Sequence, residues 1–318
     1  MNKESLKDVI QKINDSDQKN LKVFVMLKSG KIKNLKISTD VSDSLLKLFV
    51  PYLMEEFVTT DTEYKIKPVD EMNDESANTY YFFDTSNMYE RLTTFQLFTD
   101  TQEVFSFDDA SFNDIETFFI SIASEDNKVF LYKKHYPINL LKRGKVLHLF
   151  KSNEHIDEFK EDILRLDRSF QFLSYNGNIL VANLNMLERQ LGYSDIIIKN
   201  AKDVLQIISS LDFLADMAKL EEMVLTTRIA KKVNRVKSSR VIDVIKADIK
   251  RVQGFIDKIA ELKSSLKFND DNKLEVTTKV AVEKLLKLLD DAYLKSELTE
   301  EWYNSLNKDS IDAPSTDN

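Results

Sequence analysis

The sequence predicts an α+β fold in which an N-terminal antiparallel or mixed sheet domain, residues 1–190, precedes a mainly helical domain, residues 191–318. Short apolar runs separated by turn residues fill the first part of the chain, whereas apolar residues recur every three or four positions from Leu184 onward. Glycine and proline are scarce, at 5 and 4 of 318 residues, which argues against an all-β protein built on many tight turns.

Two amphipathic helices are expected in the sheet domain, over residues 2–13 and 40–56. The second helix contains Pro51, which lacks a backbone N–H and crowds the preceding turn. We therefore expect it to kink or divide at that residue.

Strands are expected where apolar and β-branched residues alternate between turn residues. The expected strands cover residues 21–27, 31–37, 64–69, 80–83, 95–98, 104–107, 118–124, 128–134, 144–150, 170–174 and 179–183. Gly30 supplies a positive φ angle in the first hairpin, and Asn176-Gly177 supplies the two positive φ angles of a type I′ turn in the last.

The helical domain is expected to consist of consecutive amphipathic segments with a break at Ser238-Ser239, where the apolar register slips by one residue. The expected helices cover residues 184–192, 200–209, 212–225, 226–237, 241–266 and 278–290. The fifth would run uninterrupted for about seven turns. Residues 268–277 are expected to form a turn and a short strand, and Leu294 to Ile311 to return to the sheet or to a partner's edge.

Charge is distributed unevenly along this acidic chain of net charge -8. Residues 226–251 hold nine basic residues against two acidic ones, or +7, which leaves -15 for the rest. At about 100° per residue, four cations of this segment share one helix face, with apolar residues on another. These cations are Arg228, Lys231, Lys232 and Arg235. Such a face is typical of a polyanion binder, and solvated or intramolecularly paired side chains are the alternative.

Two further segments are lopsided in charge. Residues 127–153 carry seven cations and no carboxylate, and residues 55–125 carry 17 acidic residues against three basic ones. Phe130, Tyr132, Tyr136 and Phe150 are interleaved with the first set and could stack on bases, although their alternation with lysines is also that of a strand core. The acidic region is either a solvated surface or a docking surface for a basic partner.

The sequence contains no motif that predicts catalysis, a metal or a cofactor. There is no cysteine, and no two of the three histidines have the i, i+4 spacing of a helical metal site. Gly144-Lys145 lacks the rest of a phosphate-binding loop. Glu63-x-Lys65 and Glu158-x-Lys160 match half of a two-metal nuclease motif, a pattern that arises by chance in a chain with 31% charged residues. We therefore expect a non-enzymatic protein.

Three blocks of the sequence resemble a known family. They are KRGKVLHLF at 142–150, LDRSFQFLSYNGNILVAN at 166–183 with Leu187-Glu188 just beyond, and LLKLLDDAYLKSELTEEWYNSLNK at 285–308. In order and spacing they are similar to the family of the B subunit of the Kiwa anti-phage defence system, from about Phe95 onward. The region before Phe95 is diverged, and Asn307-Lys308 stands where the family usually has Ser-Lys.

This resemblance implies a bacterial protein that acts with a small transmembrane A subunit, associates with itself, binds DNA and blocks phage DNA replication and expression. The implied location is the cytoplasm, with recruitment to the inner face of the membrane by the partner. No 18-residue apolar run predicts a membrane span in this chain itself, and the charged N-terminus is unlike a signal peptide.

Together, the charge pattern and the resemblance predict a homodimeric effector that contacts DNA phosphates without reading sequence. The predicted contacts come from the two basic segments: Arg228, Lys231, Lys232, Arg235, Lys237 and Arg240, and Lys133, Lys134, Lys142, Arg143 and Lys145. Lys246, Lys250 and Arg251, beyond the expected break, are weaker candidates. The alternatives are a scaffold that docks on a membrane protein or anionic lipid and a metal-dependent nuclease.

Overall fold

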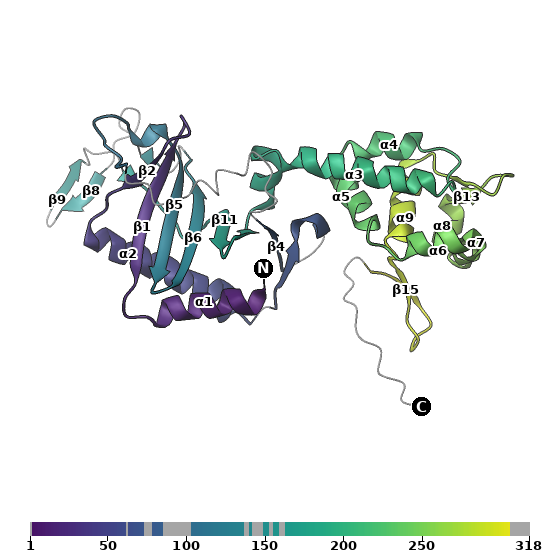
Figure 1. The fold of residues 1–318 in the computed structure, drawn as a ribbon, viewed down its shortest axis with the longest axis horizontal. Helices are drawn as coiled ribbons and strands as arrows, with labels where there is room; N and C mark the ends of the chain where they lie inside the picture. Colours follow the sequence, from purple (N-terminus) through teal and green to yellow (C-terminus); the bar gives the residue numbers. More distant parts are fainter. Residues whose placement is uncertain are drawn as a thin grey trace. The chain divides into compact units, whose positions relative to one another are not determined.

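The computed structural model describes residues 2–61, 63–72, 78–84, 103–136, 140–141, 149–152, 155–158 and 163–305. It has a mixed sheet near the N-terminus and a mostly helical C-terminal region, which confirms the predicted α+β fold (Figure 1). The chain divides into a sheet unit, Met1–Lys67 with Asn78–Leu191, and a helical unit, Pro68–Ala77 with Gly192–Asn318. That the two domains predicted from the sequence are independent stays a prediction.

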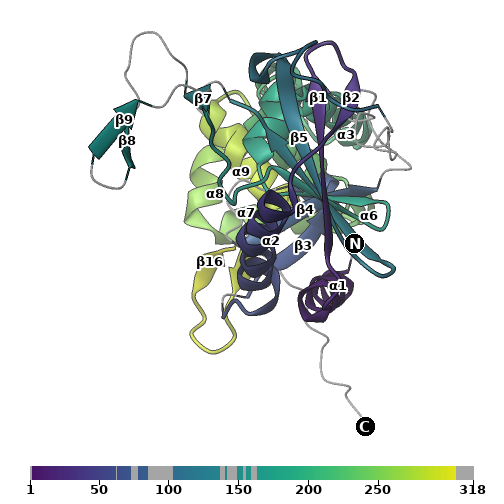
Figure 2. The same cartoon turned by 90° about the vertical axis from the view of Figure 1, so that its left-hand side faces the viewer.

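An eight-stranded sheet forms the centre of the sheet unit, in the order β2-β1-β5-β6-β11-β12-β4-β3. Its strands are β1 (Asn20–Leu27), β2 (Ile32–Leu35), β3 (Lys65–Pro68), β4 (Thr79–Asp84), β5 (Ile115–Ser124), β6 (Asn127–Lys134), β11 (Phe172–Tyr175) and β12 (Asn178–Val181). β1 lies between β2 and β5 (Figure 2) and is antiparallel to both. Short strand pairs outside this sheet are β7 (Leu140–Leu141) with β10 (Ile163–Leu164), and β8 (Leu149–Ser152) with β9 (His155–Glu158).

The predicted turns are confirmed at the backbone level. Gly30 has φ 82°, and the hairpin of β11 and β12 turns at Asn176 and Gly177, with φ 47° and 69°. Positive φ angles cost little for glycine and asparagine, so these residues fix the hairpin registers.

One face of the sheet is covered by α1 (Lys3–Asp15), α2 (Thr39–Leu53) and the π-helical turn η1 (Met54–Val58). α2 continues through Pro51, so the predicted division of the helix is wrong, and the kink predicted as its alternative stays a prediction. The helix carries Phe49, Val50 and Leu53 into the core on either side of the proline. Burial of these side chains, at about 1.5–3 kcal/mol each, outweighs a proline cost of about 3 kcal/mol.

Three expected strands are absent or lie wholly or mostly outside the described residues. Val104 forms an isolated bridge with Asn34, so residues 104–107 are not a strand. Residues 95–98 lie outside the described part of the chain, as does most of 144–150, of which only Leu149 and Phe150 are placed, in β8.

The helical unit consists of short helices and two small hairpins. The helices are α3 (Tyr193–Ser210), α4 (Ala218–Val224), α5 (Thr227–Val236), α6 (Val241–Ala247), α7 (Ile249–Lys258), α8 (Ala260–Ser265) and α9 (Lys279–Leu289). The hairpins pair β13 (Lys267–Phe268) with β14 (Leu274–Glu275), and β15 (Tyr293–Lys295) with β16 (Trp302–Asn304). The 3-10 turn η2 (Val69–Glu71) also packs in this unit, against α5.

The expected seven-turn helix over residues 241–266 is wrong, because the chain breaks twice. Asp248 has extended backbone angles, and its side chain accepts a hydrogen bond from the backbone N–H of Lys250. Ile259 is extended as well, between α7 and α8. Each short helix still buries its share of the apolar residues, so spacing alone could not distinguish one helix from three. The break expected at Ser238-Ser239 is confirmed, between α5 and α6.

Other helix boundaries also differ from those expected. The segment expected to be helical over residues 212–225 becomes helical only at Ala218, and Leu214 forms a bridge with Leu274 instead. The expected helix over residues 200–209 is part of α3, which already begins at Tyr193. Among the described residues, no helix combines the length and apolar character needed to cross a bilayer.

Candidate nucleic-acid interface

Helix α5 forms where its basic residues predicted it, but most of its circumference is buried. Ile229, Val233 and Val236 face the core as expected, while Lys231 and Lys232 are only 5% and 7% exposed. The prediction of one packed face and one open cationic face is therefore wrong for these two lysines. The reason is that α3, α4, α9 and η2 all contact α5.

Lys231 lines a small, partly open cavity in the helical unit. The cavity is also lined by Asp70 from η2, by Tyr193 and Asn200 from α3, and by Asn234. Burial, with a smaller contribution from the Asp70 carboxylate, raises the pKa of Tyr193. A phosphate could reach Lys231 only if this packing opened, since a buried ammonium has exchanged water for protein neighbours.

The two arginines at the ends of α5 are in ion pairs with α9. The Nη2 atom of Arg228 lies 2.5 Å from Oε1 of Glu283, and Nη2 of Arg235 lies 3.0 Å from Oδ2 of Asp290. The hydrogen bond from Arg228 lowers the pKa of Glu283, to which Lys232 and Lys279 also contribute. Arg235 keeps only 13% of its side chain exposed, against 49% for Arg228. The alternative of intramolecular pairing therefore describes both arginines.

Cations just beyond α5 are exposed instead. Lys237 and Arg240 flank the break between α5 and α6, and Lys246, Lys250 and Arg251 flank the break at Asp248. None of the five is in an ion pair with another residue that the structure describes. Two acidic residues, Asp243 and Asp248, lie between them in the sequence, so residues 237–251 have a net charge of +3. We call these five residues the cationic segment.

The structure thus reverses the order of preference that the sequence suggested within residues 226–251. Regular spacing favoured Arg228 to Arg235, but those residues are buried or paired. The breaks expose Lys246, Lys250 and Arg251, which the sequence ranked lower. The pair Asp248 and Lys250, an Asx cap inside a helical pattern, is the signal that could have shown the second break.

The second basic region contributes less than expected. The ammonium of Lys133 is buried and lies 2.6 Å from Oδ1 of Asp167, 2.8 Å from the backbone oxygen of Ser169 and 3.1 Å from its Oγ. Burial alone raises the pKa of Asp167, but hydrogen bonds from Lys133 and Ser169 outweigh it and hold the pKa at about 2. Lys133 is therefore a structural cation, and its prediction as an open phosphate contact is wrong.

Lys134 is half-buried and donates to Oε1 of Gln190 at 2.9 Å. Lys142, Arg143 and Lys145 lie outside the described residues, so their predicted contacts stay predictions. Tyr132 packs edge-on against Phe119 and Phe172, at 5.4 Å and 5.3 Å between ring centroids. It is a core residue of the sheet rather than a stacking platform.

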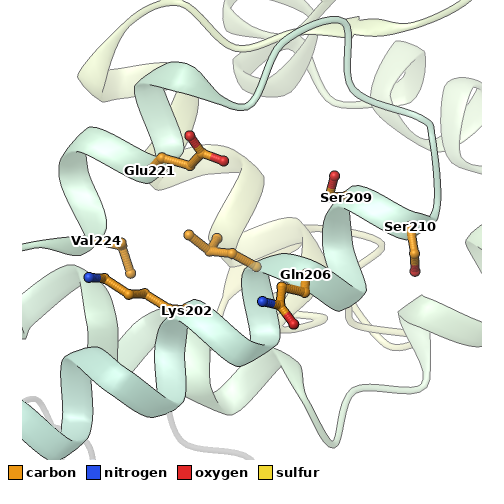
Figure 3. Close-up of a pocket in the computed structure, with 7 residues that line it drawn as sticks. Lys202, Gln206, Ser209, Ser210, Glu221 and Val224 are labelled. Carbon is orange, nitrogen blue, oxygen red and sulfur yellow. The ribbon is translucent and has the colours of Figure 1, made fainter.

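A pocket of 570 Å³ lies between α3 and α4 (Figure 3). Its polar lining mixes one amine with one carboxylate, Lys202 and Glu221, beside Gln206 and Ser209. The volume is that of a small-molecule site. Its lining lacks the excess of positive charge that a phosphate backbone requires, so the pocket does not extend the cationic segment.

Glu63 and Glu158, the acidic residues of the nuclease alternative, do not belong to a cluster of possible metal ligands among the described residues. No group of three or more His, Asp or Glu side chains there is close enough to hold a metal ion. Glu63 is exposed, Glu158 belongs to β9, and Lys160 lies outside the described residues.

Comparison with known proteins identifies relatives of this chain. A family model described as Kiwa protein KwaB-like matches residues 112–299. The Kiwa protein KwaB of Escherichia coli O55:H7 (strain RM12579 / EPEC) is 23% identical over 319 residues, which cover 98% of this chain and 100% of the relative. No solved structure matches.

Proposed function

The chain belongs to the Kiwa protein KwaB-like family and is thereby a component of an anti-phage defence system. We propose that it acts in this system by binding DNA through contacts to the phosphates. The observation that carries this proposal is the cationic segment. Five exposed cations without intramolecular ion pairs among the described residues gather at two helix breaks of an acidic protein. Exposed, unpaired cations gain most from phosphate contact, because no internal carboxylate has to be displaced.

We further propose that the role is non-enzymatic and that the bound protein obstructs replication and expression of phage DNA. In this proposal a transmembrane A subunit of the same system recruits it to the inner face of the membrane, and the protein associates with itself as a homodimer. The family membership supports the existence of partner subunits. A plasmid incubated with the pure protein and Mg²⁺ or Mn²⁺ should stay intact, and cleavage lost in Glu63→Ala would contradict the non-enzymatic role.

Charge reversal tests DNA binding. The triple variant Arg240→Glu, Lys250→Glu and Arg251→Glu should weaken binding to a 30-base-pair duplex by at least tenfold, measured by fluorescence anisotropy at about 0.1 M salt. All three residues are exposed, so folding should be retained.

The matched control is Lys199→Glu, Lys202→Glu and Lys267→Glu, which makes the same change in net charge at exposed positions of the helical unit. This control should lower the affinity for the duplex by less than about threefold, because the effect of net charge acts at long range and is screened at this salt concentration. Equal losses in the two triples would show that only net charge matters and would contradict the assignment.

A second candidate function uses the same residues. Anionic lipid attracts basic segments by about 1 kcal/mol per cation near the membrane surface, so the cationic segment also suits docking on a membrane. Flotation with vesicles of phosphatidylglycerol separates the two. Vesicle binding that survives the first triple variant, with DNA binding lost, would leave DNA as the ligand of these residues.

A further inference from the structure

The pocket between α3 and α4 is built from one face of each helix. The residues that line it on α3 are three or four positions apart and therefore share a face: Lys202, Leu205, Gln206 and Ser209. On α4 the lining residues are Glu221 and Val224, which are three positions apart. Leu205 and Val224 are buried, whereas the polar lining residues are exposed. The pocket thus combines an apolar floor with polar walls (Figure 3).

The connection between α3 and α4 is fixed on β14. The backbone N–H of Ala215 donates to the oxygen of Leu274 at 2.9 Å, and the N–H of Leu274 donates to the oxygen of Phe213 at 2.8 Å. The side chains of Phe213 and Leu214 are buried as well. Both helices that form the pocket also pack against α5. The walls are therefore held in one arrangement before a ligand arrives, which lowers the entropy cost of binding.

Opposite charges face this pocket from its two walls. Lys202 comes from α3 and Glu221 from α4 (Figure 3). Neither of them is in an ion pair with another residue that the structure describes. The neighbouring Glu222, by contrast, lies 2.7 Å from the ammonium of Lys219 on the same helix. An ammonium and a carboxylate that line one pocket without pairing can each form a charge-assisted hydrogen bond with a ligand.

Two uncharged polar side chains of α3 are also available. The amide of Gln206 and the hydroxyl of Ser209 make no hydrogen bond within the described part of the chain. The hydroxyl of Ser210 differs, because it donates to the backbone oxygen of Ile207 at 2.7 Å. An amide and a hydroxyl each offer both a donor and an acceptor. They suit a ligand with polar atoms between its charged ends.

The lining excludes several classes of ligand. It carries one positive and one negative side chain, so a phosphate would face Glu221 and a simple cation would face Lys202. None of the described lining residues is aromatic, so a nucleobase would have no side chain on which to stack. The remaining class is a molecule without net charge that carries an ammonium and a carboxylate at separate positions.

We propose that the pocket binds a small zwitterion with an apolar side chain, either a free amino acid or a short peptide. Its ammonium pairs with Glu221 and its carboxylate with Lys202, while its apolar side chain lies on Leu205 and Val224. The volume of 570 Å³ admits either source of the zwitterion. The pocket shares no residue with the cationic segment, so this assignment is independent of DNA binding.

Isothermal titration calorimetry of the full-length chain with leucine and with leucyl-leucine tests the ligand class. At least one of the two should bind with a dissociation constant of about 1 mM or below. Leucine that binds as tightly as the dipeptide would identify a free amino acid as the ligand, and a preference for the dipeptide would identify a peptide. The absence of binding by both at about 10 mM would overturn the proposal.

Two variants test the orientation of the ligand. Glu221→Gln should weaken binding of the zwitterion at least about fivefold, yet it should bind the N-acetylated probe, which lacks the ammonium, as well as the wild type does. Lys202→Gln should show the same pattern with the amidated probe, which lacks the carboxylate. Each variant therefore loses discrimination at one end of the ligand only.

The matched controls are Glu222→Gln and Lys199→Gln, which make the same chemical changes on α4 and α3 outside the pocket lining. Both should bind the zwitterion as the wild type does. All four positions are exposed, and far-UV circular dichroism identical to the wild type shows that each variant is folded. Binding that both pocket variants leave unchanged, or that the controls weaken equally, would overturn the assignment.

Discussion

The buried ammonium of Lys133 is held by the carboxylate of Asp167. Asp167→Asn should reduce the free energy of unfolding by about 1–3 kcal/mol, because it keeps an oxygen acceptor but removes the negative charge opposite a buried ammonium. The estimate stays below that for a fully buried pair, since the Asp167 side chain is 52% exposed. Urea denaturation at pH 7 measures it, and an unchanged midpoint would contradict the structural role of Lys133.

The same pair predicts a dependence of stability on pH. The pKa of Asp167 is about 2 in the folded protein, below its ordinary value of 3.8. A carboxyl whose pKa is lowered by folding stabilises above its unfolded pKa, and the contribution is lost as pH falls from about 4 to 2. The difference in stability between wild type and Asp167→Asn should therefore shrink across that window. A difference that is constant from pH 6 to pH 2 would contradict it.

Arg235 and Asp290 form the more enclosed pair of α5, with side chains 13% and 21% exposed. Asp290→Ala should destabilise the protein by about 2–4 kcal/mol, because the guanidinium stays enclosed without its charge partner. The control is Asp8→Ala in the open pair with Lys12, where both side chains are more than half exposed and solvent screening makes the expected loss of stability negligible. Thermal unfolding of both variants compares them, and similar losses would contradict the distinction.

At the scale of elements, the breaks within residues 241–266 decide which cations are exposed. Asp248→Ala removes the side chain that caps α7 and should cost about 1 kcal/mol. Asp248→Asn keeps an oxygen acceptor at the cap, so it should reduce the free energy of unfolding by only a few tenths of the loss expected for Asp248→Ala. Urea denaturation of the two variants tests the cap, and equal losses would assign the effect to charge instead.

The elements that the sequence predicted well are those with a local cause. The turns at Gly30 and Asn176-Gly177 follow from backbone angles that few other residues adopt. The threefold division of residues 241–266 could not be predicted from apolar spacing, because short helices separated by single extended residues bury nearly the same positions as one long helix.

At the scale of the whole molecule, the sequence could identify a basic segment but not its neighbours. Which residues share a helix face is a local property, whereas Lys231 and Lys232 are buried by α3, α9 and η2, which come from distant parts of the chain. Residues 68–72, between two strands of the sheet, pack with the helical unit, and no pattern in the sequence indicates this. The sequence therefore identifies which basic residues could bind a partner, and the tertiary packing determines which of them are exposed.

The salt dependence of DNA affinity tests most directly whether the cationic segment binds phosphates. Each phosphate contact that is lost reduces the slope of log K against log salt by about 0.9 for duplex DNA. The variant with Arg240, Lys250 and Arg251 changed to Glu should therefore have a slope shallower by about 2.7 than the wild type. The triple variant at Lys199, Lys202 and Lys267 should keep the wild-type slope. A wild-type slope in the first variant would contradict the account.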